Sequence, residues 1–155
     1  MNEKLKVYFA CAIRGEQGGA EEKKLIVGII QDLGHEVLSE IFLGQNLHTN
    51  DLAKMDPTEI CDRDLNWIEQ ADVIVADVSR ISLGVGLEIG WKVGRGGRVV
   101  ALCHEDRFHP LSNMIKGLAQ SKYVKPGQVS IHTWPGINQS NILKKILTDE
   151  LGTVK

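Results

Sequence analysis

The feature of this sequence that most constrains its fold is a regular alternation of short apolar runs with segments of helical period. The apolar runs predict strands at residues 5–10, 35–41, 71–78, 98–103 and 128–134. Helical spacing of apolar side chains predicts helices at residues 21–33, 56–70, 83–94, 112–119 and 137–151. Strands that alternate with helices pair in parallel and carry helices on both faces. We therefore expect one α/β domain over residues 1–155, a three-layer flavodoxin-like or Rossmann-like fold with a five-stranded, mostly parallel sheet.

Local signals fix two of the helix ends. Asp56 is a good N-cap, Pro57 suits the first helical position, and Glu59 completes the pattern of a helix start. Gly34 follows the first helical segment, where a left-handed residue commonly ends a helix. The polar segment 42–54 has no clear period and is expected to be a long loop, which in a compact domain is often functional.

Charge and cysteine content exclude several classes of protein. Eighteen Lys and Arg against 20 Asp and Glu give a net charge of -2, which leaves no electrostatic footprint for nucleic acid or an anionic membrane. The chain shows no signal-peptide pattern and no apolar stretch long enough to span a bilayer. Cys11, Cys61 and Cys103 lie far apart in apolar surroundings, typical of reduced, buried thiols. We expect a soluble, cytoplasmic protein.

Ligands of open parallel sheets bind beyond the carboxyl ends of the strands. The segments to inspect are therefore "YFACAIRGEQGG", "DVSRISLGVGLEIG" and "HEDRFHPLSN". The glycine spacing in the second segment departs from the dinucleotide fingerprint, and no acidic residue closes the next strand. A helix start with small residues and Ser82 can nevertheless approach an anion. His104 and His109 are five residues apart, which suits a loop, and we predict no metal.

Two carboxyl groups fall on or beside apolar helix faces. Asp64 shares a stripe with Ile60 and Ile68, and Glu88 lies beside the inner face of the helix that follows Ser82. Each has an ordinary interpretation: Asp64 pairs with an arginine, and Glu88 only serves the positive helix end, which favours its anionic form. Each also has a catalytic interpretation, because buried carboxyl groups concentrate at active sites. Tyr8 is either a core residue or a hydrogen-bond partner for a catalytic carboxylate.

The segments "VYFACAIRG", "DRDLNWIEQADVIVADVS", "SLGVGLEIG" and "LSNMIKG", in this order and spacing, resemble the nucleoside 2-deoxyribosyltransferase superfamily. The resemblance is strongest to its 2'-deoxynucleoside 5'-monophosphate N-glycosidase branch. It implies that Glu88 attacks the anomeric carbon and forms a glycosyl-enzyme intermediate. It also implies that Asp64 serves as acid and base and that Tyr8 orients Glu88, the logic of a retaining glycosidase.

The resemblance further implies a phosphate site and a homodimer. The phosphate contacts would come from the turn Cys11, Ala12, Ile13, Arg14 and Gly15, from Ser82 and Gly84, and from Ser112, Asn113 and Met114 of the neighbouring subunit. Ser112 alone also reads as a helix N-cap. The chain departs from the family where Ala12 replaces a hydroxyl residue of the phosphate turn and where Ile41 replaces a histidine.

Three functions remain open from the sequence. The leading expectation is a hydrolase, without cofactor, that splits deoxynucleoside 5'-monophosphates into free base and 2-deoxyribose 5-phosphate. A deoxyribosyltransferase that exchanges bases on nucleosides is the alternative within enzymes; the ending "DELGTVK" lacks the asparagine or tyrosine usual in transferases. A nucleotide-binding module without catalysis is the alternative of another class, because acids near helix starts can be purely structural.

Overall fold

Five parallel strands form a single sheet at the centre of the molecule. The computed structural model describes residues 3–13, 19–39 and 55–154. The strands are β1 (Lys6–Ala10), β2 (Glu36–Val37), β3 (Val73–Asp77), β4 (Arg98–His104) and β5 (Val129–Trp134), in the order β2-β1-β3-β4-β5. Every neighbouring pair is parallel. The α/β class is confirmed, and the order is that of flavodoxin-like sheets, whose strand order reverses between β1 and β3.

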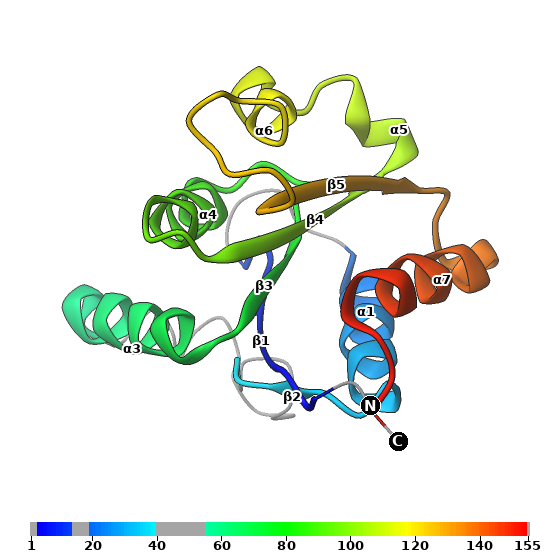
Figure 1. Ribbon diagram of the computed structural model, residues 1–155, viewed down its shortest axis with the longest axis horizontal. Helices are drawn as coiled ribbons and strands as arrows, with labels where there is room; N and C mark the ends of the chain where they lie inside the picture. The colour runs from blue at the N-terminus through cyan, green and yellow to red at the C-terminus, as the bar shows by residue number, and fades with distance from the viewer. Residues whose placement is uncertain (1–2, 14–18, 40–54, 155) are drawn as a thin grey trace.

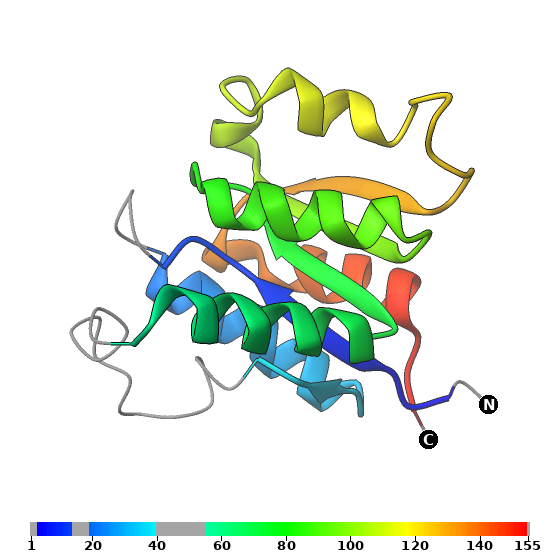
Figure 2. The same cartoon turned by 90° about the vertical axis from the view of Figure 1, so that its left-hand side faces the viewer.

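Helices cover both faces of this sheet. Helices α1 (Ala20–Asp32) and α7 (Ser140–Leu151) lie on one face, and α3 (Pro57–Gln70) and α4 (Leu83–Gly94) lie on the other (Figures 1 and 2). Two short helices, α5 (Glu105–Phe108) and α6 (Asn113–Leu118), lie at the β5 end of the sheet (Figure 1). The result is the three-layer arrangement that the sequence pattern predicts.

The alternation of side chains along β1 decides which of them reach the α3 and α4 layer. Val7 and Phe9 belong to the core beneath α1 and α7, whereas Tyr8 and Ala10 belong to the core beneath α3 and α4. Successive side chains of a strand point to opposite faces of its sheet. Tyr8 therefore shares a layer with the two helices that carry Asp64 and Glu88.

The predicted helix ends are present. The Asp56 carboxylate accepts hydrogen bonds from the backbone N–H groups of Thr58 and Glu59, at 2.8 and 3.3 Å, and caps α3. Gly34 has a φ of 93° just after α1. A Cβ at this residue would also lie 2.7 Å from the Val154 side chain, so both the conformation and the close contact favour glycine.

Three predicted elements differ in the structure. Strand β2 has only two residues. Before it, the His35 ring accepts from the Leu5 N–H, and after it the Ser39 hydroxyl, instead of the backbone, bonds to the N–H and carbonyl oxygen of Phe9. Residues 105–108 form α5 rather than a loop, with His104 Nδ1 accepting from the Asp106 N–H. The last helical segment is split into a 3-10 turn (Ile137–Gln139) and α7. The predicted loop 42–54 and Ile41 lie outside the described residues.

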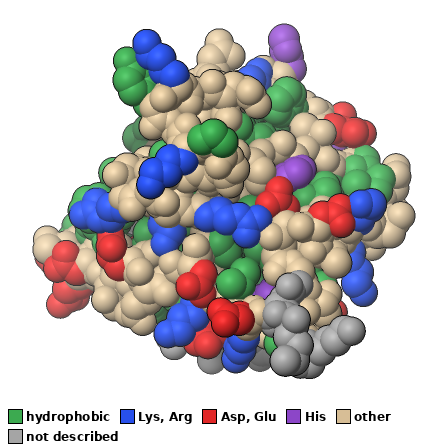
Figure 3. Space-filling model, in the orientation of Figure 1, with side chains coloured by type: hydrophobic (Ala, Val, Ile, Leu, Met, Phe, Trp, Pro, Cys, Tyr) green, Lys and Arg blue, Asp and Glu red, His purple; other side chains and the backbone are tan. Residues whose placement is uncertain are grey.

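The expectation of three buried cysteines is wrong at one position. Cys11 and Cys103 are buried, but Cys61 is exposed, because α3 turns only Ile68 fully into the core. Side chains of both charge signs are interspersed on the face shown in Figure 3. Within the described ranges, no helix has the length and apolarity needed to cross a membrane.

Candidate active site

A partly buried hydrogen bond joins strand β1 to helix α4. Tyr8 on β1 is 3% exposed, and its hydroxyl donates to Glu88 Oε1 at 2.8 Å. Glu88 lies in the second turn of α4, beside Val85 and Ile89, which anchor that helix in the core. The sheet therefore fixes the phenol, and the helix brings the carboxyl group to it.

Burial controls the ionisation of this pair. The pKa of Glu88 is raised from 4.5 to about 7, mainly by burial and further by the negative charge of Asp64, although the Tyr8 hydrogen bond lowers it. The pKa of Tyr8 is raised well above its ordinary value, first by burial and then by Glu88 and Asp64. The expectation that the helix N-terminus would favour ionised Glu88 is wrong, because desolvation outweighs it.

Asp64 lies on α3 and is paired with its neighbour Arg63. Arg63 Nε donates to Asp64 Oδ1 at 2.9 Å, and Nη2 lies 2.9 Å from the same oxygen. Burial raises the pKa of Asp64, and the hydrogen bond and charge of Arg63 oppose that rise. The sequence suggested some arginine partner for Asp64 but did not identify Arg63, because adjacent helical residues do not normally face each other.

The turn after β1 is only partly within the described residues. Cys11 and Ala12 are buried and Ile13 is 38% exposed, while Arg14 and Gly15 lie outside the described residues. Lys23 Nζ on α1 donates to the Ala12 carbonyl oxygen at 2.5 Å. Burial raises the pKa of Cys11 to about 12, so its thiol is protonated at neutral pH.

The start of α4 leaves room above its first turn. Ser82 is the N-cap, and its Oγ accepts from the Val85 N–H at 3.3 Å. Within the described residues, a Cβ on Gly84 would approach nothing closer than Ser82 Oγ at 3.7 Å, and one on Gly86 would meet nothing within 4 Å. The packing of the described protein therefore does not itself require glycine here.

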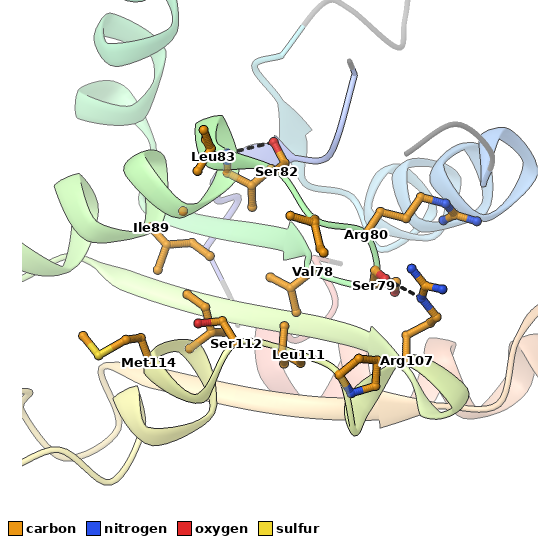
Figure 4. A pocket seen from close by; sticks show the side chains of 15 residues that line it. Val78, Ser79, Arg80, Ser82, Leu83, Ile89, Arg107, Leu111, Ser112 and Met114 are labelled. Carbon is orange, nitrogen blue, oxygen red and sulfur yellow. Dashed lines mark hydrogen bonds between the residues drawn. The ribbon is translucent and has the colours of Figure 1, made fainter. Parts of the chain in front are cut away.

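Ser82 and Ser112 line one cavity of about 450 Å³ between α4 and α6 (Figure 4). Met114 also lines it, whereas Asn113 does not. Ser112 occupies the N-cap position of α6 but makes no capping side-chain hydrogen bond. Tyr8, Asp64 and Glu88 do not line this cavity. Within one chain, Ser112 and Glu88 thus belong to different surfaces.

The fold and site together define a class of protein. A flavodoxin-like sheet presents a tyrosine-bound carboxyl group and a second, arginine-bound carboxyl group in one layer. Two carboxyl groups with different environments can divide nucleophilic and acid–base work, as in glycosidases.

Comparison with known proteins places the chain in a family. The family model described as "Nucleoside 2-deoxyribosyltransferase" matches residues 7–142, and the chain belongs to this family. Through its relatives, the chain is an enzyme of the N-hydrolase, or N-glycosidase, group.

Three similar proteins illustrate the relationship. "Putative 2'-deoxynucleoside 5'-phosphate N-hydrolase 1" of Thermofilum pendens is 36% identical over 77% of this chain and 82% of its own length. "5-hydroxymethyl-dUMP N-hydrolase" of Rattus norvegicus is 38% identical over 73% of this chain and 69% of its own. The solved CMP N-glycosidase of Clostridium botulinum has a TM-score of 0.65 at 22% identity, covering 94% of this chain and 99% of that one. This last likeness establishes the shared fold.

Proposed function

We propose that this enzyme hydrolyses the N-glycosidic bond of 2'-deoxynucleoside 5'-monophosphates and releases the free base and 2-deoxyribose 5-phosphate. The observation that carries the proposal is the partly buried Tyr8–Glu88 hydrogen bond, with the charge of Asp64 acting on both groups. The names of the relatives from Thermofilum pendens and Rattus norvegicus support the substrate class.

In the proposed first step, the Glu88 carboxylate attacks C1' of the sugar as the bond from C1' to the base nitrogen breaks. The electron pair of that bond leaves with the base, and Asp64 assists by supplying a proton. A pKa near 7 leaves a substantial fraction of Glu88 ionised at neutral pH. The Tyr8 hydroxyl orients the carboxylate by donating to one of its oxygens.

In the proposed second step, water attacks C1' of the glycosyl-enzyme and Asp64 takes the water proton. The ester bond to Glu88 breaks, which returns the carboxylate and releases the sugar phosphate. Two displacements at the same carbon retain its configuration. The two steps together consume one water molecule and need no redox reagent.

We propose that the substrate phosphate binds near the start of α4 and that a second subunit completes the site. Ser82 offers a hydroxyl group and Gly84 a backbone N–H group at the N-terminus of α4, a helix of 12 residues. The turn at residues 11–15 would add further donors. Ser112, Asn113 and Met114 are exposed, so they are available to a neighbouring molecule in a homodimer.

Base release is the direct test of this function. The purified protein is incubated with common deoxy- and ribonucleoside 5'-monophosphates and with the matching nucleosides, and free base is measured by chromatography. Release from deoxynucleoside monophosphates without an acceptor base supports the hydrolase. Strict dependence on an added second base identifies the transferase instead, and binding without turnover identifies a nucleotide-binding module.

Replacement of the nucleophile tests the mechanism. We expect Glu88→Ala to reduce kcat by at least about 1000-fold while the circular dichroism spectrum stays unchanged, because the proposed covalent intermediate forms on Glu88. Mass spectrometry of the wild-type protein, quenched during turnover, should detect the deoxyribosyl phosphate adduct on the peptide that contains Glu88. Normal turnover by the folded variant contradicts the mechanism.

A further inference from the structure

Arg63 holds a conformation that its position in the helix does not favour. Neighbouring residues of a helix point about 100° apart, so Arg63 must fold back to reach Asp64. Two other contacts hold it there: its guanidinium carbon lies 4.9 Å from the centre of the Trp67 ring, and Nη1 lies 3.9 Å from Met55 Sδ. Its side chain is only 24% exposed. The arginine is therefore fixed on three sides.

The contact engages a single oxygen of Asp64. Arg63 Nε and Nη2 both lie 2.9 Å from Oδ1, and only the Nε contact has hydrogen-bond alignment. No described residue donates a hydrogen bond to Oδ2. An arginine that holds one carboxylate oxygen restrains that oxygen and leaves the other oxygen available.

The titratable and charged groups around Asp64 come from three elements. Arg63 acts from α3 itself, Tyr8 from β1 and Glu88 from α4, since the charge of Asp64 raises the pKa of both Tyr8 and Glu88. Arg63 is the cation of this set. Loss of its contact with Asp64 should therefore raise the pKa of Asp64.

We propose that Arg63 is a positioning residue that clamps Asp64 Oδ1, so that Oδ2 is directed to the reacting groups and the Arg63 charge helps Asp64 to give up its proton. The part of this inference that concerns turnover rests on the proposed function. Arg63 has two proposed effects: its contact orients the Asp64 carboxyl group, and its positive charge acts on the ionisation of that group. Two substitutions separate these effects.

Arg63→Gln removes the charge, and Arg63→Lys keeps the charge without the planar fork. In Arg63→Gln, the effect of burial on Asp64 is unopposed and the pKa of Asp64 rises. The alkaline limb of the kcat/KM profile, which reports loss of the Asp64 proton, therefore moves to higher pH. In Arg63→Lys, that limb returns toward its wild-type position. Its kcat still falls by about tenfold to 100-fold, because the carboxyl group is no longer aligned.

Arg95→Gln is a matched control. Arg95 Nε lies 2.7 Å from Glu69 Oε1, and its guanidinium carbon lies 3.7 Å from the centre of the Trp91 ring. It thus repeats the arrangement of arginine, carboxylate and tryptophan between α3 and α4, away from the Tyr8–Glu88 pair. We expect its pH profile and kcat to match those of the wild-type protein.

A titration that needs no turnover separates this inference from the proposed function. The protein is labelled with 13C at the aspartate carboxyl groups, and the Asp64 signal is assigned by its loss in Asp64→Asn. The Asp64 midpoint should rise in Arg63→Gln and stay at its wild-type value in Arg95→Gln. An unchanged midpoint in Arg63→Gln overturns the proposal, whatever the activity. A wild-type protein that releases no base overturns only the function.

Discussion

At the scale of single residues, burial and a helix N-terminus have opposite effects on the pKa of Glu88. A helix N-terminus favours an anion by about 0.3–1 kcal/mol. Burial and the nearby Asp64 carry the pKa of Glu88 from 4.5 to about 7, and each unit corresponds to about 1.4 kcal/mol. Burial therefore decides the resting charge of Glu88, and the Tyr8 hydrogen bond is the main force that favours its ionised form.

The first prediction concerns this hydrogen bond. In Tyr8→Phe the Glu88 carboxylate loses its hydrogen-bond donor, so the pKa of Glu88 rises further. The ionised carboxylate needed for attack is then present only at higher pH. We expect the pH profile of kcat/KM to move to higher pH and the rate at neutral pH to fall by roughly 10- to 100-fold, in line with a lost hydrogen bond to a charged group. An unshifted profile measured by base release would show that Tyr8 does not act on Glu88.

The second prediction concerns the effect of the buried Glu88 carboxyl group on stability. Because the folded protein holds the Glu88 proton more tightly than the unfolded chain, stability falls as pH rises from about 4.5 to about 7. Glu88→Gln keeps an acceptor for Tyr8 without the buried charge. It should raise the free energy of unfolding by roughly 1–3 kcal/mol above pH 7 and change it little below pH 4.5. Urea unfolding at both pH extremes provides the measurement, and equal effects at both would argue against a buried charge.

At the scale of elements, the spacing of α3 and α4 matters because each helix carries one of the two carboxyl groups. Lys92 on α4 is buried, and its Nζ donates to the carbonyl oxygens of Ile68 and Ala71 at the end of α3. These carbonyls would otherwise lack partners at a helix C-terminus. A Cβ on Gly97 would lie 2.5 Å from the Lys92 side chain, so the following turn leaves space for the lysine stem.

The third prediction tests this connection. Lys92→Met keeps the apolar stem but leaves two buried carbonyls without their donor, which should lower the free energy of unfolding by about 2–4 kcal/mol. Base release should fall as well, since α3 loses two hydrogen bonds to α4. Lys24→Met, on the exposed side of α1, should change stability by less than about 0.5 kcal/mol. Equal stability of the two variants would contradict the structural role proposed for Lys92.

At the scale of the whole molecule, one apolar surface is exposed around the cavity between α4 and α6. The exposed side chains are Ile81 at 79%, Leu83 at 92% and Met114 at 80%, all of which line the cavity with Ser82 and Ser112. Grouped apolar side chains of this kind mark interaction sites on proteins. The proposed second subunit would cover this surface and bring its own Ser112 to the neighbouring site.

The fourth prediction follows from that surface. Leu83→Asp places a charge in the proposed interface, so it should convert dimer to monomer in light scattering and reduce base release by at least about tenfold. Ile137→Asp, on an exposed apolar residue at the α7 side, should leave the dimer intact. A fully active monomeric Leu83→Asp protein would contradict a shared site.

Mixing inactive subunits tests the sharing itself. Glu88→Ala and Ser112→Ala proteins are combined under conditions in which subunits exchange, and base release is followed over time. If Ser112 acts across the interface, part of the mixed dimers contain one intact site and activity returns. Absence of activity after verified exchange would assign Ser112 to its own subunit.

The sequence by itself determined the layers of the molecule and much of the site's position. Continuous apolar runs predicted the strands, because helices cover both faces of a parallel sheet. Apolar side chains at helical spacing predicted the helices, because each helix buries one face. The N-cap Asp56 and the limits of α4 followed from local backbone chemistry, which needs no tertiary context. The short β2 did not follow, because contacts with distant segments limit it. The exposure of Cys61 did not follow either, because the packing of α3 decides which of its residues are buried.

Only the tertiary structure decided the state of the functional groups. Glu88 and Asp64 could be identified on their helices, but their charges depend on desolvation and on partners from β1 and α3. The Arg63 clamp also requires the positions of Trp67 and Met55, which no helical period specifies. Periodicity assigns a residue to a face, whereas a pKa and an ion pair depend on every group that the folded chain brings to that face.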